Sequence, residues 1–550
     1  MAFIERYYQT EMLDAAEASF DKGVRKMVLA SATGTGKSYV FSKLYERFKK
    51  RLPKRMLIIA HSEELVRQNA ATAKEVNPDA KVGIEQGETQ SDPDCDIISG
   101  CIYSLNRGKR LERMINVDKI VVDEAHHAVA DSYQTFLSEV WTPEKLLVGM
   151  TATPTRGDGR PLGEVFESIP YVYSLRQAIA DGYLVEPCGF TLRTKIDLSE
   201  VKKGSSGDYQ KDALAAAINT AERNQQIVQF WRHYAADKRT VVFCATIEHA
   251  RKMCDAFQLA GVQTAYIWGD DPDRELKISM HQKGEIDVLC NVGILVEGYN
   301  DPNIGCVVLA RPTVSPVLFA QMVGRVTRLA PGKFVGLVLD VVDSVGKNTL
   351  LTLPTLFGMP WSIQLNGHSA YAAVKRIEEL QETHPGIDFT KLDDFTQLDA
   401  FVEKAKLFEV RFPKEIEENS SLMWHKSIEG GYRINVPKPD KDTKGGYVRV
   451  FQNALDKWEI NGIIGGARFH GFRAGMEDAI KTADEQITRR AGSVMKLLNR
   501  KATWHKEKPS IGQELLWKKI MGGRPFPEGA TKGEVSKLID ARLSILKERK

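Results

Sequence analysis

Short apolar runs alternate with helical stretches from residue 27 to about residue 342, and this alternation constrains the fold more than any other feature. Segments between the runs, such as Ser62–Val76 and Ile247–Ala260, have the apolar spacing of helices. The runs are rich in Val, Ile and Leu, as strands covered on both faces are. They lie at Met27–Ala30, Met56–Ala60, Asp96–Ser99, Ile120–Val122, Leu146–Val148, Thr240–Phe243, Ala265–Trp268, Val288–Leu289, Cys306–Leu309 and Val335–Val341. The pattern predicts an α/β fold with two parallel-sheet domains, joined around residues 170–190.

The alternation breaks between about residues 170 and 235. Within this break, Lys202–Gly207 is typical of a surface loop and Tyr209–Tyr234 of one long helix.

The pattern changes after residue 345. Alternating apolar and polar residues predict strands at Tyr432–Val436 and Tyr447–Phe451, with Trp458–Ile460 as a candidate third strand, and a helix at about Met476–Asn499. We therefore predict five parts: two α/β domains at 1–170 and 171–345, a mostly helical segment at 346–430, a small basic α+β module at 431–500 and a small helical unit at 501–550.

Composition narrows the class of protein. At 550 residues the chain is too long for one core, and 43% apolar with 27% charged residues is ordinary for a globular protein. No apolar run approaches the ~20 residues of a membrane helix, and the first residues do not resemble a secretory signal. The seven cysteines form no C-x-x-C pair and no cluster with histidine. We expect buried thiols in a reducing compartment, not a zinc ribbon, an iron–sulfur site or disulfides.

The net charge of +4 hides an asymmetry along the chain. Residues 421–550 carry 26 Lys and Arg against 15 Asp and Glu, a balance of +11, whereas residues 1–420 carry 50 against 57, a balance of −7. A basic region beside an acidic body favours a polyanionic partner. Basic residues that only solvate a helical surface are the alternative.

A glycine-bearing turn, Ser31–Ser38, follows the first apolar run and precedes a helical stretch. Such a turn exposes backbone N–H groups at the start of a helix, where phosphate oxygens bind. Lys37 can reach the β- and γ-phosphates, and the Ser38 hydroxyl can bind Mg²⁺. Ser31 stands where the strict pattern has its first glycine, and a turn that binds nothing is the alternative. The predicted ATP-binding residues of this turn are Thr33, Gly34, Thr35, Gly36, Lys37 and Ser38.

Two carboxylates, Asp123 and Glu124, end another apolar run. The carboxyl ends of strands in an open parallel sheet lie along its ligand-binding edge. We therefore predict that Asp123 holds Mg²⁺ and that Glu124 orients and deprotonates an attacking water. A third strand ends near Thr151 and Thr153, whose hydroxyls can link the acidic turn to the neighbouring domain.

Gln321, Arg325 and Arg328 lie at i, i+4 and i+7 of a helical stretch and therefore share one face. Two arginines on one face can clamp the charge of a transferring γ-phosphoryl group. A surface helix paired with carboxylates is the alternative, but the position in a second α/β domain after a complete nucleotide site favours the clamp.

Taken in order, these segments resemble the motifs of a superfamily 2 helicase of the DEAH type over roughly residues 4–342. Residues 6–11 resemble the adenine-reading segment of this superfamily, which implies that Gln9 contacts the base. The other resemblances are Ser31–Ser38 to motif I, 60–68 to motif Ia, Asp123–His126 to the DEAH box, Thr151–Thr153 to motif III, Val242–Ala245 to motif IV, Leu295–Pro302 to motif V and Gln321–Arg328 to motif VI.

Finer comparison favours the DNA-acting branch. Residues 153–159 resemble the T-P-x-R-x-D-G run of branch-migration helicases, repair and transcription translocases and restriction motor subunits, and residues 310–313 fit the same branch. Asn300 stands where motif V usually carries an aspartate, with Asp301 beside it as a candidate substitute. The compact length fits a helicase of a bacteriophage or mobile element.

The resemblance implies two tandem RecA-like domains with ATP and Mg²⁺ between them, and Gly298 and Asn300 near the nucleotide. It implies that His126, Thr151 and Thr153 couple hydrolysis to movement. Nucleic acid is expected to cross both domains at His61, Arg67 and Ser104, although His61 is alternatively a helix cap. In the C-terminal module Arg433 and Arg449 are candidate DNA contacts, and a lid or brace on the motor is the alternative.

The expected function is an ATP-dependent DNA helicase or translocase that moves on and unwinds single-stranded or forked DNA in replication, recombination or repair. We expect it in a bacterial or phage-infected host cytoplasm, associated with the nucleoid, away from membranes, with replication or recombination proteins as candidate partners. Three alternatives stay open: a double-stranded DNA translocase of a restriction or defence complex, an RNA helicase, and a nucleic-acid clamp switched by ATP. Glu124, Arg325 and Arg328 count against the clamp.

Overall fold

The computed structural model describes most of the chain and divides it into two compact units. These are Met1–Leu356 with Leu365–Tyr371, and Phe357–Gln364 with Ala372–Lys550. The described residues are 5–152, 162–204, 208–344, 351–383, 387, 389–405, 416, 419–422, 424–427, 431–436, 446–453, 456–492 and 495–498. Thr153, the run at 153–159 and the predicted helical unit at 501–550 lie outside the described residues. The five predicted domain limits stay a prediction.

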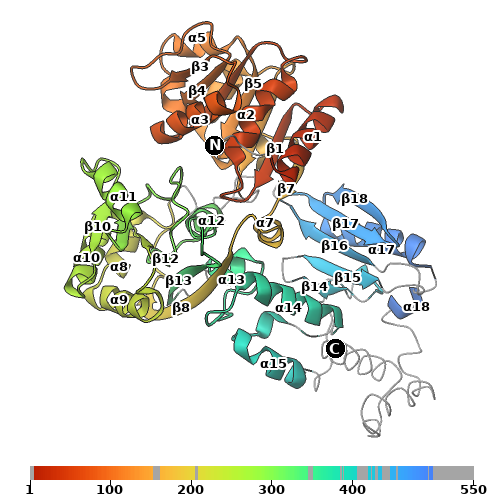
Figure 1. The fold of residues 1–550 in the computed structure, drawn as a ribbon. Coiled ribbons are helices and arrows are strands. Elements are labelled where there is room, and N and C mark those ends of the chain that lie inside the picture. Colours follow the sequence, from red (N-terminus) through yellow and green to blue (C-terminus); the bar gives the residue numbers. More distant parts are fainter. Residues whose placement is uncertain are drawn as a thin grey trace, which may run out of the picture. The chain divides into compact units, whose positions relative to one another are not determined.

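The first unit begins with a parallel sheet of seven described strands in the order β3-β4-β2-β5-β6-β1-β7. Its central strands are buried along almost their whole length, as the continuous apolar runs predict. Figure 1 shows this sheet in red to orange, flanked by helices. The strands are β1 (Lys26–Ser31), β2 (Arg55–Ala60), β3 (Val82–Glu85), β4 (Ile97–Cys101), β5 (Val117–Asp123), β6 (Leu146–Thr151) and β7 (Ser168–Tyr173).

Two helices of this first α/β domain, α3 and α7, start at serine side chains that accept backbone hydrogen bonds. Ser62 caps α3 by accepting from Leu65 N at 3.3 Å, and Ser174 caps α7 by accepting from Gln177 N at 3.1 Å. The helices are α1 (Tyr7–Asp21), α2 (Lys37–Phe48), α3 (Glu63–Val76), α4 (Ile102–Leu105), α5 (Arg110–Met114), α6 (Asp131–Val140) and α7 (Leu175–Ala180), with 3₁₀ turns η1 (Ala125–His127) and η2 (Leu162–Glu164).

A second parallel sheet follows in the same unit, with six described strands in the order β10-β11-β9-β12-β13-β8. In Figure 1 its strands run from yellow (β8) to green. Its strands are β8 (Glu186–Asp197), β9 (Thr240–Phe243), β10 (Thr264–Ile267), β11 (Val288–Asn291), β12 (Cys306–Leu309) and β13 (Val335–Ser344). Its helices are α8 (Lys211–Ile218), α9 (Ala221–Ala235), α10 (Ile247–Leu259), α11 (Arg274–Lys283) and α12 (Pro316–Gly324), and α13 (Leu353–Leu356) follows. The predicted pair of parallel-sheet α/β domains is confirmed.

The predicted helix Tyr209–Tyr234 is wrong, because the segment forms two helices. The chain leaves helical geometry at Asn219, and the Thr220 hydroxyl accepts from Arg223 N at 3.2 Å to begin α9. Strands β3, β7 and β8 were also missed. Their partly exposed residues break the continuous apolar run that marks a fully covered strand.

The C-terminal unit contains an antiparallel sheet in the order β14-β15-β16-β17-β18. Helix α17 packs against one face over a core that includes Trp424, Ile434, Val450 and Ile480. The predicted helix Met476–Asn499 instead ends at Ala491, since Gly492 takes a left-handed backbone conformation. The elements are α14 (Ala370–Thr383, which begins in the first unit), η3 (Phe389–Lys391), η4 (Phe395–Gln397), α15 (Leu398–Ala405), β14 (His425–Lys426), β15 (Tyr432–Val436), β16 (Gly446–Gln452), β17 (Trp458–Ile464), β18 (Ala467–Arg473), α17 (Met476–Ala491) and α18 (Met495–Leu498).

Two further features bear on the sequence predictions. None of the seven cysteines is paired in a disulfide, and six of them are buried. Among the described residues, no helix combines the length and hydropathy that crossing a bilayer requires.

A buried ion pair holds the second α/β domain together. Arg223, 1% exposed, donates to both carboxylate oxygens of Asp343 at 2.9 and 2.8 Å and to Ala310 O at 3.0 Å. The pair ties the start of α9 to β13 and to the segment after β12.

Replacing Arg223 by Met should leave the Asp343 carboxylate buried without its cation. Breaking such a pair costs about 3–5 kcal/mol, so hydrogen exchange of the β12 and β13 amides should quicken accordingly. The matched control is Arg251→Met, which removes an exposed pair with Glu248 and should change nothing measurable. Equal protection in both variants would contradict the role given to Arg223.

Candidate functional site

The phosphate loop between β1 and α2 is shaped by two glycines in the left-handed region. Gly34 has φ +88° and Gly36 φ +86°, a conformation that disfavours side chains. Ser31 and Thr35 form a side-chain hydrogen bond, and the Thr35 hydroxyl donates to Ala32 O at 2.6 Å. Ser31, which replaces the usual glycine, therefore stabilises the turn through a hydrogen bond within it. The Thr33 hydroxyl oxygen is buried and has no hydrogen-bond partner among the described residues.

Residues of the N-terminal helix α1 donate hydrogen bonds to the backbone of this loop. Gln9 is 4% exposed, and its Nε2 donates to Thr35 O at 3.2 Å. The Tyr8 hydroxyl donates to the same carbonyl at 2.6 Å, while the Tyr8 ring stacks on Tyr173 with centroids 3.9 Å apart. A Cβ atom on Gly36 would lie 2.7 Å from Gln9 Nε2. The structure thus places Gln9 against the loop, and its contact with adenine stays a prediction.

The acidic turn after β5 lies against the phosphate loop. Lys37 Nζ is 3.7 Å from Glu124 Oε1, and Asn69 donates to Asp123 Oδ2 at 2.9 Å. Glu124 has φ +52°, a strained value for a residue with a side chain and one often found at functional sites. Thr151, also predicted here, ends β6 fully buried.

The two carboxylates have opposite electrostatic environments. Burial and the neighbouring Glu124 charge raise the pKa of Asp123 to about 6. Burial also acts to raise the pKa of Glu124, but Lys37 and His126 outweigh it and lower that pKa to about 2. Glu124 is therefore ionised at neutral pH, and a cation beside Asp123 would relieve the crowding of negative charge.

Of the two predicted arginines, Arg325 is buried and Arg328 is partly buried, and both face the loop after β11. The prediction that they share one helix face with Gln321 is wrong, because α12 ends at Gly324 and both arginines follow it. Arg325 donates to Val296 O at 2.7 Å and to Tyr299 O, and Arg328 donates to Tyr299 O at 2.7 Å. Burial lowers the pKa of Arg325 to about 9, with Arg328 adding to the effect, and lowers that of Arg328 to about 10. Within the described part of the chain neither guanidinium forms an ion pair, so neither charge is neutralised by a carboxylate contact.

The end of α12 touches the phosphate loop of the first domain. A Cβ on Gly324 would lie 2.7 Å from Thr33 Cβ, and one on Gly34 would lie 3.4 Å from Arg328 Cγ. The side chain of Arg328 therefore lies over the loop, whereas Arg325 holds the carbonyls of residues 296 and 299. Gln321, 2% exposed, donates to Glu297 Oε1 at 3.0 Å and does not face the phosphate loop.

The predicted motif V residues in the loop after β11 differ in their exposure and in their contacts. Gly298 has φ +74° and lies close to Gln68 of α3, and Asn300 is exposed. Asp301 is 2% exposed and accepts from Asn303 N at 2.9 Å, with His281 Nδ1 4.0 Å from its carboxylate. Asp301 is turned into its own domain, so it is not placed to substitute for the aspartate that Asn300 replaces.

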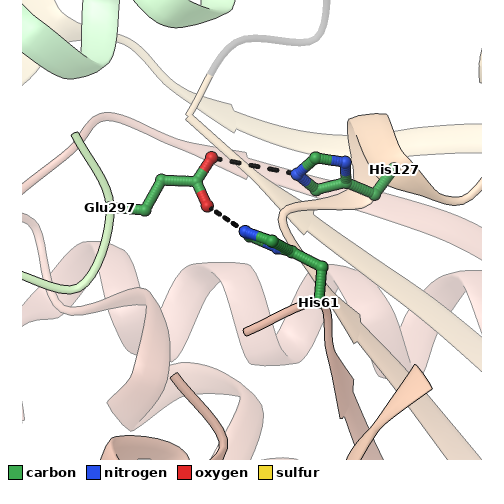
Figure 2. Close-up of side chains that lie close together, drawn as sticks. All are labelled: His61, His127 and Glu297. Carbon is green, nitrogen blue, oxygen red and sulfur yellow. Dashed lines mark ion pairs between the residues drawn. The ribbon is translucent and has the colours of Figure 1, made fainter. Parts of the chain in front are cut away.

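A cluster of histidines surrounds Glu297, as Figure 2 shows for His61 and His127. His61 Nε2 lies 2.7 Å from Glu297 Oε2, and His127 Nε2 lies 3.8 Å from Oε1. His126 stands between the two domains, with Nδ1 3.4 Å from Glu124 and Nε2 3.9 Å from Glu297. The cluster borders a cavity of about 1020 Å³. His126 thus connects the acidic turn to the second domain, which fits the coupling role predicted for it.

The three predicted nucleic-acid contacts of the first domain differ in how accessible their side chains are. Arg67 is exposed on α3 and lines the cavity. His61 is held by Glu297, and Ser62 rather than His61 caps α3. Ser104 is 7% exposed and its hydroxyl accepts from Gly87 N at 3.0 Å, so the structure does not present it as a contact. Ser104 lies on the inward side of the short helix α4, and the local sequence did not reveal this burial.

The C-terminal sheet exposes the face that α17 does not cover. Arg433 and Arg449 stand directly opposite each other on β15 and β16, and Arg449 stands opposite Asn461. The Arg433 guanidinium lies 4.6 Å from the Tyr447 ring centroid, and that of Arg449 lies 5.1 Å from the Phe451 centroid. Both side chains are partly buried, and their positive charges lie close together on this face.

Two residues of the site were missed by sequence reasoning. Glu297 lies within the predicted motif V, and His127 directly follows the predicted DEAH box. Their positions in the sequence were a signal, but the contact between them joins segments 170 residues apart, and only the fold brings these together.

Two family models match the chain over the two parallel-sheet domains. Residues 3–156 match "Type III restriction enzyme, res subunit", and residues 218–330 match "Helicase conserved C-terminal domain". The two α/β domains are therefore similar to helicase domains, and we call them the two helicase domains below. The C-terminal sheet module lies outside both matches.

Among the curated relatives that match are two proteins of yeasts that are named as helicases. The ATP-dependent helicase IRC3 of Saccharomyces cerevisiae is 34% identical over 64% of this chain and 53% of its own length. The mitochondrial ATP-dependent helicase irc3 of Schizosaccharomyces pombe is 32% identical over 64% of this chain and 60% of its own. The chain thus spans between half and two thirds of these relatives. A solved fragment of an assigned type I restriction HsdR subunit from Vibrio vulnificus is similar at 24% identity, with a TM-score of 0.49, over 62% of this chain and 69% of its own.

Replacing Gly324 by Ala tests the contact between α12 and the phosphate loop. The new methyl group would meet the branched Cβ of Thr33, so the helicase domains must part and carry Arg328 away from Gly34. A displacement of about 1 Å in a catalytic group can cost 10²-fold, and we expect ATP turnover to fall at least about tenfold. Gly475→Ala, at a glycine with no atom within 4 Å, is the control. Unchanged turnover in Gly324→Ala would contradict the contact.

Proposed function

We propose that this protein is an ATP-dependent DNA helicase or translocase that couples ATP hydrolysis to movement along DNA. The observation that carries the proposal is the pair of arginines that follows α12: Arg325 is buried, and Arg328 is partly buried over the phosphate loop of the other helicase domain. Burying a cation without an anionic partner is costly, and the γ-phosphate of a bound ATP would supply the anion.

The residues present fit ATP with Mg²⁺. The backbone of Thr33–Gly36 and the Lys37 ammonium would hold the phosphates, and Ser38 with Asp123 would hold Mg²⁺, which neutralises phosphate charge. Glu124, ionised and ordered by Lys37 and His126, would accept a proton from the attacking water. Arg328 would stabilise the charge that develops on the γ-phosphoryl group, and Arg325 would hold the motif V loop against the same site. Gln321 would act through Glu297 as a positioning residue.

The nucleic acid proposed is DNA, in single-stranded or forked form. The basic balance of residues 421–550 and the opposed arginines of the C-terminal sheet support a polyanion on that face. The resemblance to DNA-acting members of the superfamily favours DNA over RNA. A role in replication, recombination or repair, partner proteins of those processes, and a bacterial or phage-infected cytoplasm near the nucleoid belong to the same proposal.

A second candidate is a motor that moves along duplex DNA without separating the strands. The match of residues 3–156 to a restriction-enzyme family favours it. Two assays with ATP separate the candidates: displacement of a strand from forked DNA, 3′-tailed DNA and matching RNA, and displacement of a third strand from blunt duplex DNA. The proposal expects forked or tailed DNA to be unwound. Triplex displacement without unwinding would favour the restriction-type motor, and unwinding of RNA alone would refute the choice of DNA.

Lys37 and Glu124 should affect ATP in different ways. Lys37→Ala removes a phosphate contact and should weaken ATP binding, whereas Glu124→Gln should leave binding nearly intact and abolish turnover, because it removes only the base. Equilibrium binding of a fluorescent ATP analogue and steady-state hydrolysis measure the two effects. Turnover near the wild-type rate in Glu124→Gln would show that another group activates the water.

Arg328→Ala should lower the turnover number with little change in ATP affinity. An arginine that contacts only the transition state typically contributes about 10³-fold or more to turnover. Single-turnover hydrolysis with saturating ATP is the measurement, and Arg251→Ala, on the exposed surface of α10, is the control. If Arg328→Ala weakens binding and leaves the turnover number unchanged, the arginine binds the ground-state phosphate instead.

Replacing Arg433 and Arg449 together by Ala should weaken DNA binding and reduce its dependence on salt. For each phosphate that the protein no longer neutralises, the slope of log K against log salt becomes shallower by about 0.9. Binding titrations on forked DNA at several salt concentrations give the slope, with Arg489→Ala on α17 as the control from the opposite side of the sheet. Equal slopes in the double variant and the wild type would make this module a brace rather than a DNA anchor.

A further inference from the structure

His61, His127 and Glu297 bring three metal-binding side chains together from distant parts of the chain. His61 follows β2 and His127 lies in η1 after β5, both in the first helicase domain, whereas Glu297 follows β11 in the second. Their nearest ligand atoms all lie within 4.8 Å of one another. In Figure 2 both imidazole rings point toward the two oxygens of one carboxylate.

A simple ion pair does not account for the whole cluster. One protonated imidazole suffices for Glu297, and His61 at 2.7 Å takes that position. His127 Nε2 is left buried, and among the described residues it has no hydrogen-bond partner. The two rings lie with centroids 4.2 Å apart, so charging both would place two cations side by side. A second neutral imidazole facing a carboxylate is the arrangement in which a metal ion binds.

The dimensions suit a small tetrahedral cation. Zn²⁺ binds imidazole nitrogen and carboxylate oxygen at about 2.0–2.2 Å, which sets its ligand atoms about 3.3 Å apart. His61 Nε2 lies 2.7 Å from Glu297 Oε2, and His127 Nε2 lies 3.8 Å from Oε1. With one oxygen of Glu297 as the ligand, the three ligand atoms lie within 4.8 Å of one another, so small side-chain movements would bring them to this spacing. Gln321 Nε2 donates to Glu297 Oε1 at 3.0 Å, and this hydrogen bond helps to fix the orientation of the carboxylate.

We propose that His61, His127 and Glu297 form a binding site for a divalent transition-metal ion, Zn²⁺ in the first place, at the junction of the two helicase domains. The fourth ligand position opens to the cavity of about 1020 Å³ that all three residues line, where water can reach it. Two imidazoles and one carboxylate select Zn²⁺ over Mg²⁺, which prefers oxygen ligands. The ion would tie the first domain to the loop after β11, and its binding can be measured without ATP.

The test is direct binding of Zn²⁺ to the full-length, nucleotide-free protein without an affinity tag. Isothermal titration in excess Mg²⁺, which fills oxygen-only sites, should show one Zn²⁺ per chain. His127→Asn and Glu297→Gln should each weaken that binding by at least about tenfold, since even partners outside the ligand set contribute 10–100-fold. Co²⁺ added in place of Zn²⁺ should give the visible absorption of a tetrahedral site, and both variants should lose it.

His233→Asn is the matched control, because it removes an exposed histidine of the second domain outside the cluster. It should bind Zn²⁺ as the wild type does. None of the seven cysteines is exposed, so competing thiol sites are limited. Circular dichroism without metal checks that each variant is folded, and His61→Asn serves as a third variant. Equal Zn²⁺ affinity in the wild type and in the folded cluster variants would overturn the proposal, as would the absence of any stoichiometric binding.

Discussion

Two guanidinium groups just after α12, Arg325 buried and Arg328 partly buried, impose the constraint on which the contact between the two α/β domains depends. Arg325 and Arg328 have backbone carbonyls of residues 296 and 299 as hydrogen-bond partners, and burial lowers the pKa of both. Hydrogen bonds to carbonyl groups offset the desolvation cost of a buried cation less completely than an ion pair with a carboxylate does. An anion bound at the phosphate loop, which Arg328 already overlies, would supply the missing charge and stabilise the contact between the domains.

The loop after β11 connects this nucleotide site to the opposite side of the domain junction. Its carbonyls hold the arginines, while Glu297 in the same loop contacts Gln321, His61 and, at longer range, His126. His126 in turn approaches Glu124, the carboxylate proposed to activate water. A change at the phosphates can therefore reach the cavity bordered by Arg67 and Gln68 through a short chain of polar contacts. Under the proposed function, this chain is the route by which ATP would change the binding of a nucleic-acid strand.

Sequence reasoning predicted the elements whose signals are local. The fully covered strands β1, β5 and β6 are continuous apolar runs, and the phosphate loop and acidic turn follow them directly, so their convergence at one sheet edge was predictable. Thr220 could have been recognised as a helix cap, but the apolar spacing on either side of it looked continuous. Partly exposed strands such as β3 and β8 carry no such run.

Contacts between distant segments were beyond sequence reasoning. Ser104 looked available for nucleic acid, yet it is buried and bonded to the backbone of Gly87. Asp301 looked able to replace a missing aspartate, yet it turns toward His281 and Asn303 in its own domain. Glu297 and His127 could be recognised as neighbours only in the structure, where loops that follow strands of two different sheets meet. Neighbours in the sequence determine a strand, whereas the direction of a loop side chain depends on the packing of the domain around it.

The measurement that tests this account most directly is the distance between the two helicase domains with and without nucleotide. Spin labels at Lys74→Cys on α3 and Lys252→Cys on α10 report it, and no native cysteine is exposed to compete for the label. Double electron–electron resonance should show a distance distribution that narrows when Mg²⁺ and a non-hydrolysable ATP analogue bind. The same analogue should not narrow it in Arg328→Ala. Identical distributions with and without the analogue in otherwise wild-type protein would contradict the claim that the phosphate draws the arginines, and with them the two domains, together.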